Sequence, residues 1–164
     1  MILIGLGANL PSAAHGAPRA TLEAALEALA AAGIGLVRRS RWYRSLPLPP
    51  SDQPFYVNGV ASVASELDPQ ALLVQLHGIE ADFGRRRGAR GAARVLDLDL
   101  LAHGERVIDE DGLHLPHKRL RERAFVLLPL RDVAPHWRHP VSGETIDVLI
   151  RRLGDDLQGV TRLD

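Results

Sequence analysis

Leucine and aspartate alternate through residues 96–100, and this alternation constrains the fold more than any other part of the chain. Successive side chains of a β-strand point to opposite faces, so the leucines predict one apolar face. Asp97 and Asp99 then share the other face, with Cα atoms about 6.6 Å apart. Aspartate is disfavoured in strands and two like charges repel, so this strand needs a compensating ligand or counter-ion.

Apolar spacing and turn residues around this segment predict an order of elements. Strands are expected at residues 2–6, 36–45, 55–65 and 95–101, and helices at residues 18–32 and 68–83. Shorter helices are expected near Lys118 and at residues 124–133 and 145–153. The leading order predicts an α+β, ferredoxin-like βαββαβ core, an antiparallel sheet with helices on one face plus C-terminal additions. Polar residues on the sheet face that those helices leave uncovered would be open to a ligand.

Composition excludes several classes of protein. The 164 residues predict a single domain over residues 1–164. Cysteine is absent, which excludes thiolate metal sites and thiol nucleophiles. The formal net charge of zero excludes a globally basic nucleic-acid binder. The chain has no run of 18 apolar residues and no signal-like start, so we expect a cytoplasmic monomer without membrane or nucleic-acid partners.

The two aspartates are candidate metal ligands. Hard carboxylate oxygens suit Mg²⁺, which takes one or two carboxylates together with substrate phosphates. Two aspartates on one strand could hold a pair of Mg²⁺ ions about 3.5–4 Å apart. The alternative is a structural ion network between Asp97, Asp99 and nearby arginines. The pattern alone leaves both interpretations open.

A basic, glycine-containing segment directly precedes the aspartates. Five arginines and no acid fall between Gly84 and Arg94. Guanidinium groups bind phosphate or carboxylate in a bidentate manner. Beside a dicarboxylate, such a segment favours transfer of a phosphate-containing group, because cations neutralise the charge that develops on the oxygens. The alternative is an ordinary solvated basic loop.

Weaker features could belong to ligand pockets or to ordinary surfaces. His77 and Glu80 lie three residues apart on the flank of a predicted helix, where they could contact a nucleotide, although an ordinary half-exposed helix face explains them more simply. Tyr56 and Asn58 share one strand face beside a proline-rich segment. That face could bind a planar heterocycle or be an unspecialised polar face. His117 precedes a basic stretch, where a lone histidine is usually structural.

Several motifs together resemble one known family. They are residues 5–10 (GLGANL), 52–58 (DQPFYVN), 94–99 (RVLDLD), 115–117 (LPH), 125–130 (FVLLPL) and 134–135 (AP). Their order and spacing are similar, over nearly the whole chain, to 6-hydroxymethyl-7,8-dihydropterin pyrophosphokinases. The resemblance implies a ferredoxin-like α+β fold and transfer of pyrophosphate from ATP to the pterin hydroxymethyl oxygen, giving AMP, in folate biosynthesis. ATP and the pterin would be the small-molecule partners.

The resemblance also implies roles for individual residues. Asp97 and Asp99 would hold two Mg²⁺ ions, and the catalytic cations would be Arg85, Arg87 and Arg94. The pterin would be bound by Ser45, Leu46, Leu48, Tyr56, Asn58 and Phe125. The nucleotide would be bound by His77, Glu80, Arg87, Arg94, Leu100, His114, His117, Lys118 and Arg123.

The chain departs from the family pattern at three places. A tryptophan that commonly closes over the pterin is missing from residues 90–93, where the loop is one residue shorter. His77 stands where glutamine is common, and Gly112 stands where some members have arginine. Because the aspartates and the pterin-reading residues are intact, we expect activity to survive.

Two other functions compete with this one. A non-catalytic RNA-binding module with a ferredoxin-like sheet needs exposed aromatics to stack bases, and this chain has only seven aromatic residues. Two aspartates on the binding face would also repel phosphate. A two-metal nucleotidyl transferase shares the metal chemistry but releases pyrophosphate instead of AMP.

Overall fold

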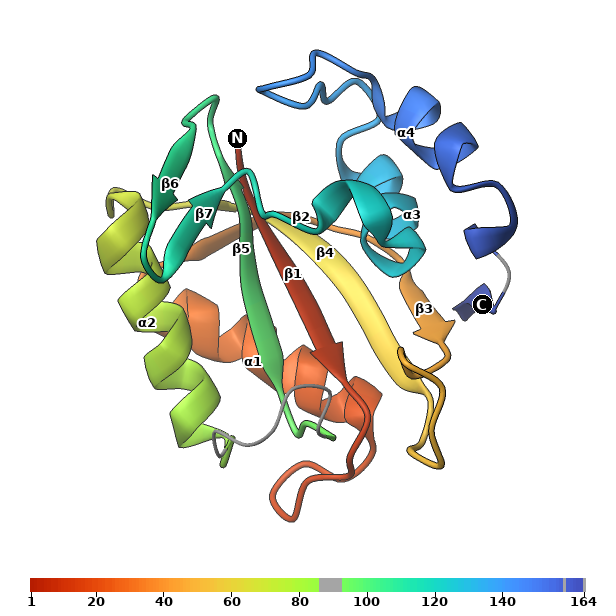
Figure 1. Cartoon of the computed structure of the whole chain (residues 1–164). Coiled ribbons are helices and arrows are strands. Elements are labelled where there is room, and N and C mark those ends of the chain that lie inside the picture. Colours follow the sequence, from red (N-terminus) through yellow and green to blue (C-terminus); the bar gives the residue numbers. More distant parts are fainter. Residues whose placement is uncertain (86–92, 158, 164) are drawn as a thin grey trace.

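The computed structural model describes residues 1–85, 93–157 and 159–163, and its centre is an antiparallel sheet (Figure 1). Within the described residues the sheet has six strands in the order β5-β1-β4-β3-β8, and β2 also pairs with β4. The strands are β1 (Ile2–Ala8), β2 (Gly35–Arg39), β3 (Trp42–Ser45), β4 (Tyr56–Ala64), β5 (Asp97–His103) and β8 (Val160–Leu163). Strands β1 and β5, far apart in sequence, lie side by side at the middle of the molecule.

Helices cover both faces of this sheet. Helices α1 (Pro18–Ala31) and α2 (Pro69–Asp82) pack on one face and bury the first hydrophobic core, as the βαββαβ prediction requires. Helices α3 (Ala124–Val133) and α4 (Ile146–Leu153) bury a second core against the other face. The C-terminal additions therefore close part of the face that α1 and α2 leave open. The 3₁₀ turn η1 (Leu120–Glu122) precedes α3, and the 3₁₀ turn η2 (Gly154–Leu157) follows α4.

The helix limits follow local chemistry that the sequence already displays. Asp68 caps α2, because its Oδ1 accepts a hydrogen bond from the backbone N of Ala71 at 2.8 Å. Pro69 occupies the first helical position, where its missing N–H costs nothing. After α1, Gly33 adopts a φ of +83°, which ends the helix. The predicted helices 18–32, 68–83 and 124–133 are thus confirmed to within a residue or two.

Strand β5 has the two faces that its sequence predicts. Leu98 and Leu100 are buried in the first core, while Asp97 and Asp99 face the other side. Leu101 lies on the same face as the aspartates and is buried in the second core. The pairing with β1 shifts register between Leu3 and Ile4, and directly after this alternation Ala102 also joins the second core. The aspartate face is therefore covered by the second core from Leu101 onward.

Three features of the fold differ from the sequence predictions. The expected strand 36–45 is two strands, separated at Ser40, whose Oγ accepts a hydrogen bond from the backbone N of Val60 at 2.9 Å. A small hairpin, β6 (Ile108–Glu110) and β7 (Leu113–Leu115), and strand β8 were not predicted.

In the described part of the chain, no helix is long and apolar enough to cross a membrane.

Gly59→Ala is expected to lower the free energy of unfolding by about 2 kcal/mol. A Cβ at this position of β4 would lie 2.5 Å from a ring carbon of Trp42, which is fully buried. The bulky indole cannot move away without disturbing the first core. Urea unfolding of the variant measures the loss, with Gly78→Ala as the control because nothing lies within 4 Å of a Cβ there. An unchanged unfolding midpoint for Gly59→Ala would contradict this packing.

Candidate active site

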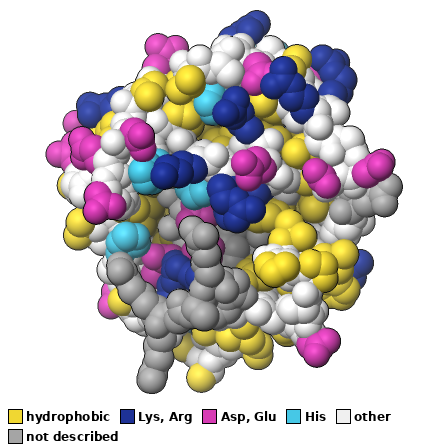
Figure 2. All heavy atoms as spheres, viewed as in Figure 1, with side chains coloured by type: hydrophobic (Ala, Val, Ile, Leu, Met, Phe, Trp, Pro, Cys, Tyr) yellow, Lys and Arg dark blue, Asp and Glu magenta, His cyan; other side chains and the backbone are white. Residues whose placement is uncertain are grey.

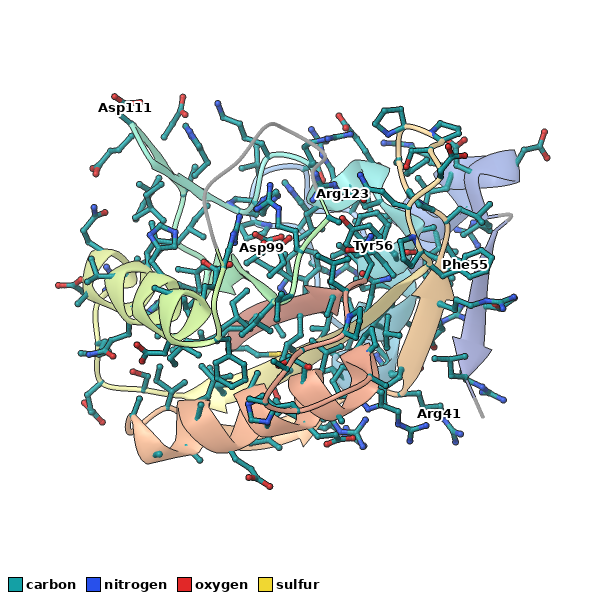
Figure 3. All side chains as sticks on the ribbon, turned by 90° about the horizontal axis from the view of Figure 1, so that it is seen from below. Arg41, Phe55, Tyr56, Asp99, Asp111 and Arg123 are labelled. Carbon is teal, nitrogen blue, oxygen red and sulfur yellow. The ribbon has the colours of Figure 1, made fainter. Side chains whose placement is uncertain are left out.

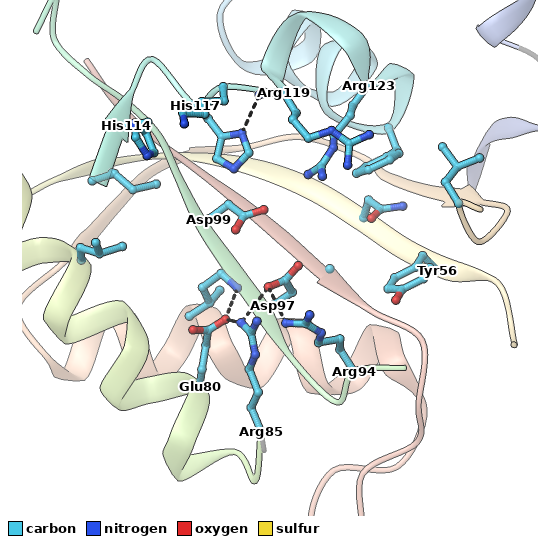
Figure 4. A pocket seen from close by; sticks show the side chains of 18 of the residues that line it. Tyr56, Glu80, Arg85, Arg94, Asp97, Asp99, His114, His117, Arg119 and Arg123 are labelled. Carbon is cyan, nitrogen blue, oxygen red and sulfur yellow. Dashed lines mark hydrogen bonds and ion pairs between the residues drawn. The ribbon is translucent and has the colours of Figure 1, made fainter. Parts of the chain in front are cut away.

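A cavity of about 650 Å³ opens over the aspartate face of the sheet, and the close-up in Figure 4 shows many of the side chains that line it. Figure 2 shows histidine and basic side chains gathered around this hollow. It is lined by all but one of the predicted site residues: Ser45, Leu46, Leu48, Tyr56, Asn58, His77, Glu80, Arg85, Arg94, Asp97, Asp99, Leu100, His114, His117, Lys118, Arg123 and Phe125. The exception, Arg87, lies outside the described residues. The fold thus gathers residues from β3, β4, β5, β7, α2 and α3 at one place.

The two aspartates are paired with glycines of the neighbouring strand. Gly7 lies opposite Asp97 in the β1–β5 register, and Gly5 lies opposite Asp99. A Cβ at Gly7 would come within 3.2 Å of Asn58 Oδ1, so glycine leaves room for that amide beside the aspartates. The two glycines repeat with the same two-residue spacing as the aspartates, a signal that was available in the sequence.

Burial makes the two carboxylates costly to ionise together. It raises the pKa of Asp97, against the opposing effects of Arg94, Arg123 and His117. Burial and the charge of Asp97 raise the pKa of Asp99 to about 7. Asp97 Oδ1 accepts a hydrogen bond from Arg85 Nη1 at 2.8 Å. Within the described residues, the Asp99 carboxylate has no hydrogen bond or salt bridge.

This arrangement fits a hard cation better than a closed ion network. A structural network would explain Asp97, which Arg85 contacts, but it leaves the Asp99 carboxylate without a hydrogen bond or salt bridge in the part of the chain that is described. No group of three or more His, Asp or Glu side chains among the described residues could hold a metal ion. Two carboxylates without further protein ligands suit Mg²⁺, which completes its coordination with water and substrate phosphates.

Glu80 supports the aspartates from beneath. This carboxylate is 3% exposed, accepts a hydrogen bond from the backbone N of Leu98 at 2.9 Å, and forms an ion pair with Arg85. Because Arg85 also contacts Asp97, Glu80 joins helix α2 to strand β5 and fixes a cation beside the aspartates. The observed contacts of Glu80 are thus with protein groups, although its side chain also lines the cavity.

The opposite wall is basic and comes from η1 and its flanks. His117 Nδ1 accepts a hydrogen bond from the backbone N of Arg119 at 3.2 Å, so the neutral ring carries its proton on Nε2. Burial, helped by the charge of Arg123, lowers the pKa of His117 to about 4. Burial also lowers the pKa of Arg123, whose guanidinium lies over the ring of Phe125 at 5.4 Å. This wall therefore offers fixed hydrogen-bond donors to an anion.

One end of the cavity suits a flat, polar ring. Asn58 Nδ2 donates a hydrogen bond to Ser45 Oγ at 2.7 Å, and both side chains are buried. Tyr56 and Phe125 supply aromatic surface nearby, and Figure 3 shows Tyr56 on the same side of the molecule as Arg123 and Asp99. Burial and the charge of Asp97 raise the pKa of Tyr56, so its hydroxyl stays protonated. The interpretation of a heterocycle pocket at Tyr56 and Asn58 is compatible with this geometry.

Part of the cavity lining is apolar. Leu73, Leu100 and Leu113 belong to it, together with His77 and His114, and Figure 4 shows His114 at the end of the cavity away from Tyr56. His114 Nδ1 lies 2.6 Å from Oδ1 of Asp109, its partner across the β6–β7 hairpin. The unpredicted hairpin therefore supplies one wall. Leu73 and Leu113 carry no chemical signal in the sequence that would mark them as site residues.

Asn9 supports the segments around the site and was not predicted from the sequence. It is 1% exposed, and its Oδ1 accepts a hydrogen bond from the backbone N of Arg94 at 2.8 Å. Its Nδ2 donates to Gln53 Oε1 at 3.1 Å and to the carbonyl of Pro54 at 3.2 Å. One buried amide thus joins the end of β1, the segment before β4 and the segment before β5. Its only sequence signal is its place in the motif of residues 5–10.

Asp99→Asn is expected to stabilise the metal-free and ligand-free protein at pH 8. The raised pKa of Asp99 gives folding a contribution that is present below about pH 4 and is lost as the pH rises to about 7. Above that pH the ionised carboxylate opposes folding, and a neutral amide does not. With EDTA present, we expect the melting temperature to rise by more than about 3 °C at pH 8 and to change little at pH 4. An equal shift at both pH values would contradict the buried position of Asp99.

Comparison with known proteins identifies relatives over most of the chain. Residues 3–135 match the family model described as 7,8-dihydro-6-hydroxymethylpterin-pyrophosphokinase (HPPK). Three relatives named 2-amino-4-hydroxy-6-hydroxymethyldihydropteridine pyrophosphokinase are similar to this chain. The Pseudomonas aeruginosa protein is 44% identical over 85% of this chain and 83% of its own. The Synechocystis protein is 40% identical over 92% of this chain and 75% of its own length. The Methylorubrum extorquens protein is 39% identical over 98% of this chain and 97% of its own length.

Solved structures share the fold. The Plasmodium falciparum HPPK-DHPS wild type with pteroate superposes with a TM-score of 0.75 at 14% identity over 98% of this chain. The triple mutant S436F/A437G/A613S of the same protein gives a TM-score of 0.76 at 16% identity. This chain spans about half the length of those proteins, covering 47% of each. At this identity the likeness concerns the fold.

Proposed function

The chain belongs to the 7,8-dihydro-6-hydroxymethylpterin-pyrophosphokinase family, and we propose that it transfers pyrophosphate from ATP to the hydroxymethyl oxygen of 6-hydroxymethyl-7,8-dihydropterin. The products are AMP and the pterin diphosphate. The observation that carries the proposal is the position of the aspartates. Asp97 and Asp99 lie between the end of the cavity at Tyr56 and the end at His114 (Figure 4). A transfer between two substrates needs its charged centre at that position.

The aspartates would hold two Mg²⁺ ions, which neutralise charge on the transferring phosphates. Arg85 and Arg94 approach Asp97 from one side, with Nη1 atoms 2.8 and 4.0 Å from its Oδ1. Both guanidinium groups line the cavity, where they can contact phosphate oxygens as well. Arg87 is proposed as a further cation of the same group.

The basic wall would bind the nucleotide phosphates. His117 presents an Nε2–H into the cavity and stays neutral at pH 7, so it donates a hydrogen bond instead of accepting a proton. Arg123 and Lys118 add positive charge on the same wall. The base would lie against Leu100, between His77 and His114, and the buried Glu80 keeps the phosphate-side arginine Arg85 in place.

The pterin would occupy the aromatic end. The Asn58 amide uses one N–H in its hydrogen bond to Ser45, so its second N–H and its Oδ1 would be available to the ring edge. Phe125 and Tyr56 would pack against the faces of the pterin ring. The backbone at Leu46 and Leu48 would form hydrogen bonds with the ring edge. The hydroxymethyl oxygen then points toward the aspartates and attacks the β-phosphorus in line with the departing AMP.

The test is to incubate the protein with ATP and Mg²⁺, with and without the pterin, and to separate AMP, ADP and pyrophosphate. The proposal expects AMP only when the pterin is present, in equal amount to the pterin diphosphate. A nucleotidyl transferase would release pyrophosphate, and an RNA-binding module would give no turnover. Either result would overturn the proposal. The tryptophan that is common in the family is missing from residues 90–93, of which residues 90–92 lie outside the described part of the chain.

A further inference from the structure

Arg119 lines the cavity, but none of the roles above includes it. It begins the η1 turn, and its backbone N donates a hydrogen bond to Nδ1 of His117. The backbone of Arg119 is therefore fixed relative to a residue of the site, while its side chain is 59% exposed and can move. Figure 4 shows Arg119 and Arg123 extending from the same turn toward the cavity.

The charges on this wall repel one another in the absence of an anion. Arg119 opposes the protonation of both Arg123 and His117. In the described part of the chain, the Arg123 guanidinium has a contact with the Phe125 ring but no hydrogen bond or salt bridge. Among the described residues, five cationic side chains and three carboxylates line the cavity. An anion between Arg119 and Arg123 would relieve this repulsion.

Glu122 holds Arg119 in the ligand-free protein. Arg119 Nε donates to Glu122 Oε2 at 3.4 Å, three residues further along the same turn, and the Glu122 side chain is 65% exposed. An exposed, long ion pair of this kind contributes little and is easily exchanged for a better partner. A phosphate group in the cavity is such a partner, because it offers several charged acceptors to one guanidinium.

We propose that Arg119 is a further binding residue for the outer phosphates of the nucleoside triphosphate, and that it leaves Glu122 when this ligand enters. The inference rests on the proposed function and adds a residue and a selective step to it. Arg119 contacts phosphates that ATP has and AMP lacks. It therefore strengthens binding of the substrate without slowing release of the nucleotide product.

The test measures binding of α,β-methylene ATP and of AMP by calorimetry in the presence of Mg²⁺. We expect Arg119→Ala to raise the Kd for the triphosphate about tenfold and the Kd for AMP less than about twofold. Glu122→Gln should lower the triphosphate Kd about two- to threefold, because Arg119 is released. In the double variant the Glu122 change should tighten binding less than in the wild type, because only the loss of its charge near Arg123 remains.

Arg121→Ala is the matched control, since it removes the same charge from the same turn. Arg121 pairs with Glu144 at 3.8 Å and does not line the cavity, so the triphosphate Kd should be unchanged. The inference is overturned if Arg119→Ala binds the triphosphate like the wild type, or if it weakens triphosphate and AMP equally. It is also overturned if Glu122→Gln tightens binding as much without Arg119 as with it. If the wild type itself binds no triphosphate, the proposed function fails together with this inference.

Discussion

Replacing Asp97 or Asp99 with asparagine is expected to lower pterin-dependent AMP formation by at least about a thousandfold while the protein stays folded. An amide is nearly the same size as the carboxylate but carries no charge for a metal ion. The two side chains share one face of β5, and among the described residues no cluster of three or more His, Asp or Glu side chains could hold a metal ion. Loss of either carboxylate therefore removes half of the negative charge that the two aspartates offer to a metal ion.

Asp111→Asn is the control for this experiment. Asp111 is exposed beside the β6–β7 hairpin and does not line the cavity, and Figure 3 shows it far from Asp99. Its replacement should leave the rate within about twofold of the wild type. A rate above about a tenth of the wild type in either aspartate variant would contradict the metal assignment. Retained folding is expected because Asp99→Asn should raise stability at pH 8.

Glu80→Ala is expected to lower the free energy of unfolding by about 3 kcal/mol. The change removes the acceptor for the Leu98 backbone N–H and the buried partner of Arg85. Arg85 is then left beside Asp97 alone, with less support from α2. Glu80→Gln keeps an acceptor for the backbone and loses only the charge, so it should lose about half as much.

Urea unfolding at pH 7.5 measures both variants, with Glu110→Ala on the exposed β6–β7 hairpin as the control. The control should unfold at the wild-type midpoint. Turnover of Glu80→Ala is expected to fall as well, because Arg85 loses its fixed position. A loss of stability below about 1 kcal/mol for Glu80→Ala would mean that the buried contacts contribute little.

The elements with strong periodicity were predictable from the sequence. The Leu–Asp alternation predicted which face of β5 each residue takes, and Asp68 and Gly33 predicted helix limits. The single strand at 36–45 was wrong because the Ser40 hydroxyl replaces a backbone partner and breaks the ladder. Strand β8 has four residues and exists through its pairing with β3. Such short strands leave little pattern in a sequence.

Some residues of the site were easier to predict from the sequence than others. Local chemistry pointed to Asp97, Asp99 and the arginines, because carboxylates in a strand and a run of cations are unusual. The wall residues come from distant segments. Local pattern marked Asn58 and His117 only as weak candidates, and Phe125 was assigned through the family resemblance alone. The supporting bonds of Asn9 and Glu80 depend on the tertiary structure and had no local signal.

The fate of isotope label in ATP shows which phosphorus the pterin hydroxymethyl oxygen attacks. The wild-type protein is incubated with Mg²⁺, the pterin and ATP labelled either at the α- or at the β-phosphate. We expect the β label in the pterin product and the α label in AMP, because the hydroxymethyl oxygen attacks the β-phosphorus. An α label in the pterin product, or label released only as free phosphate, would contradict it.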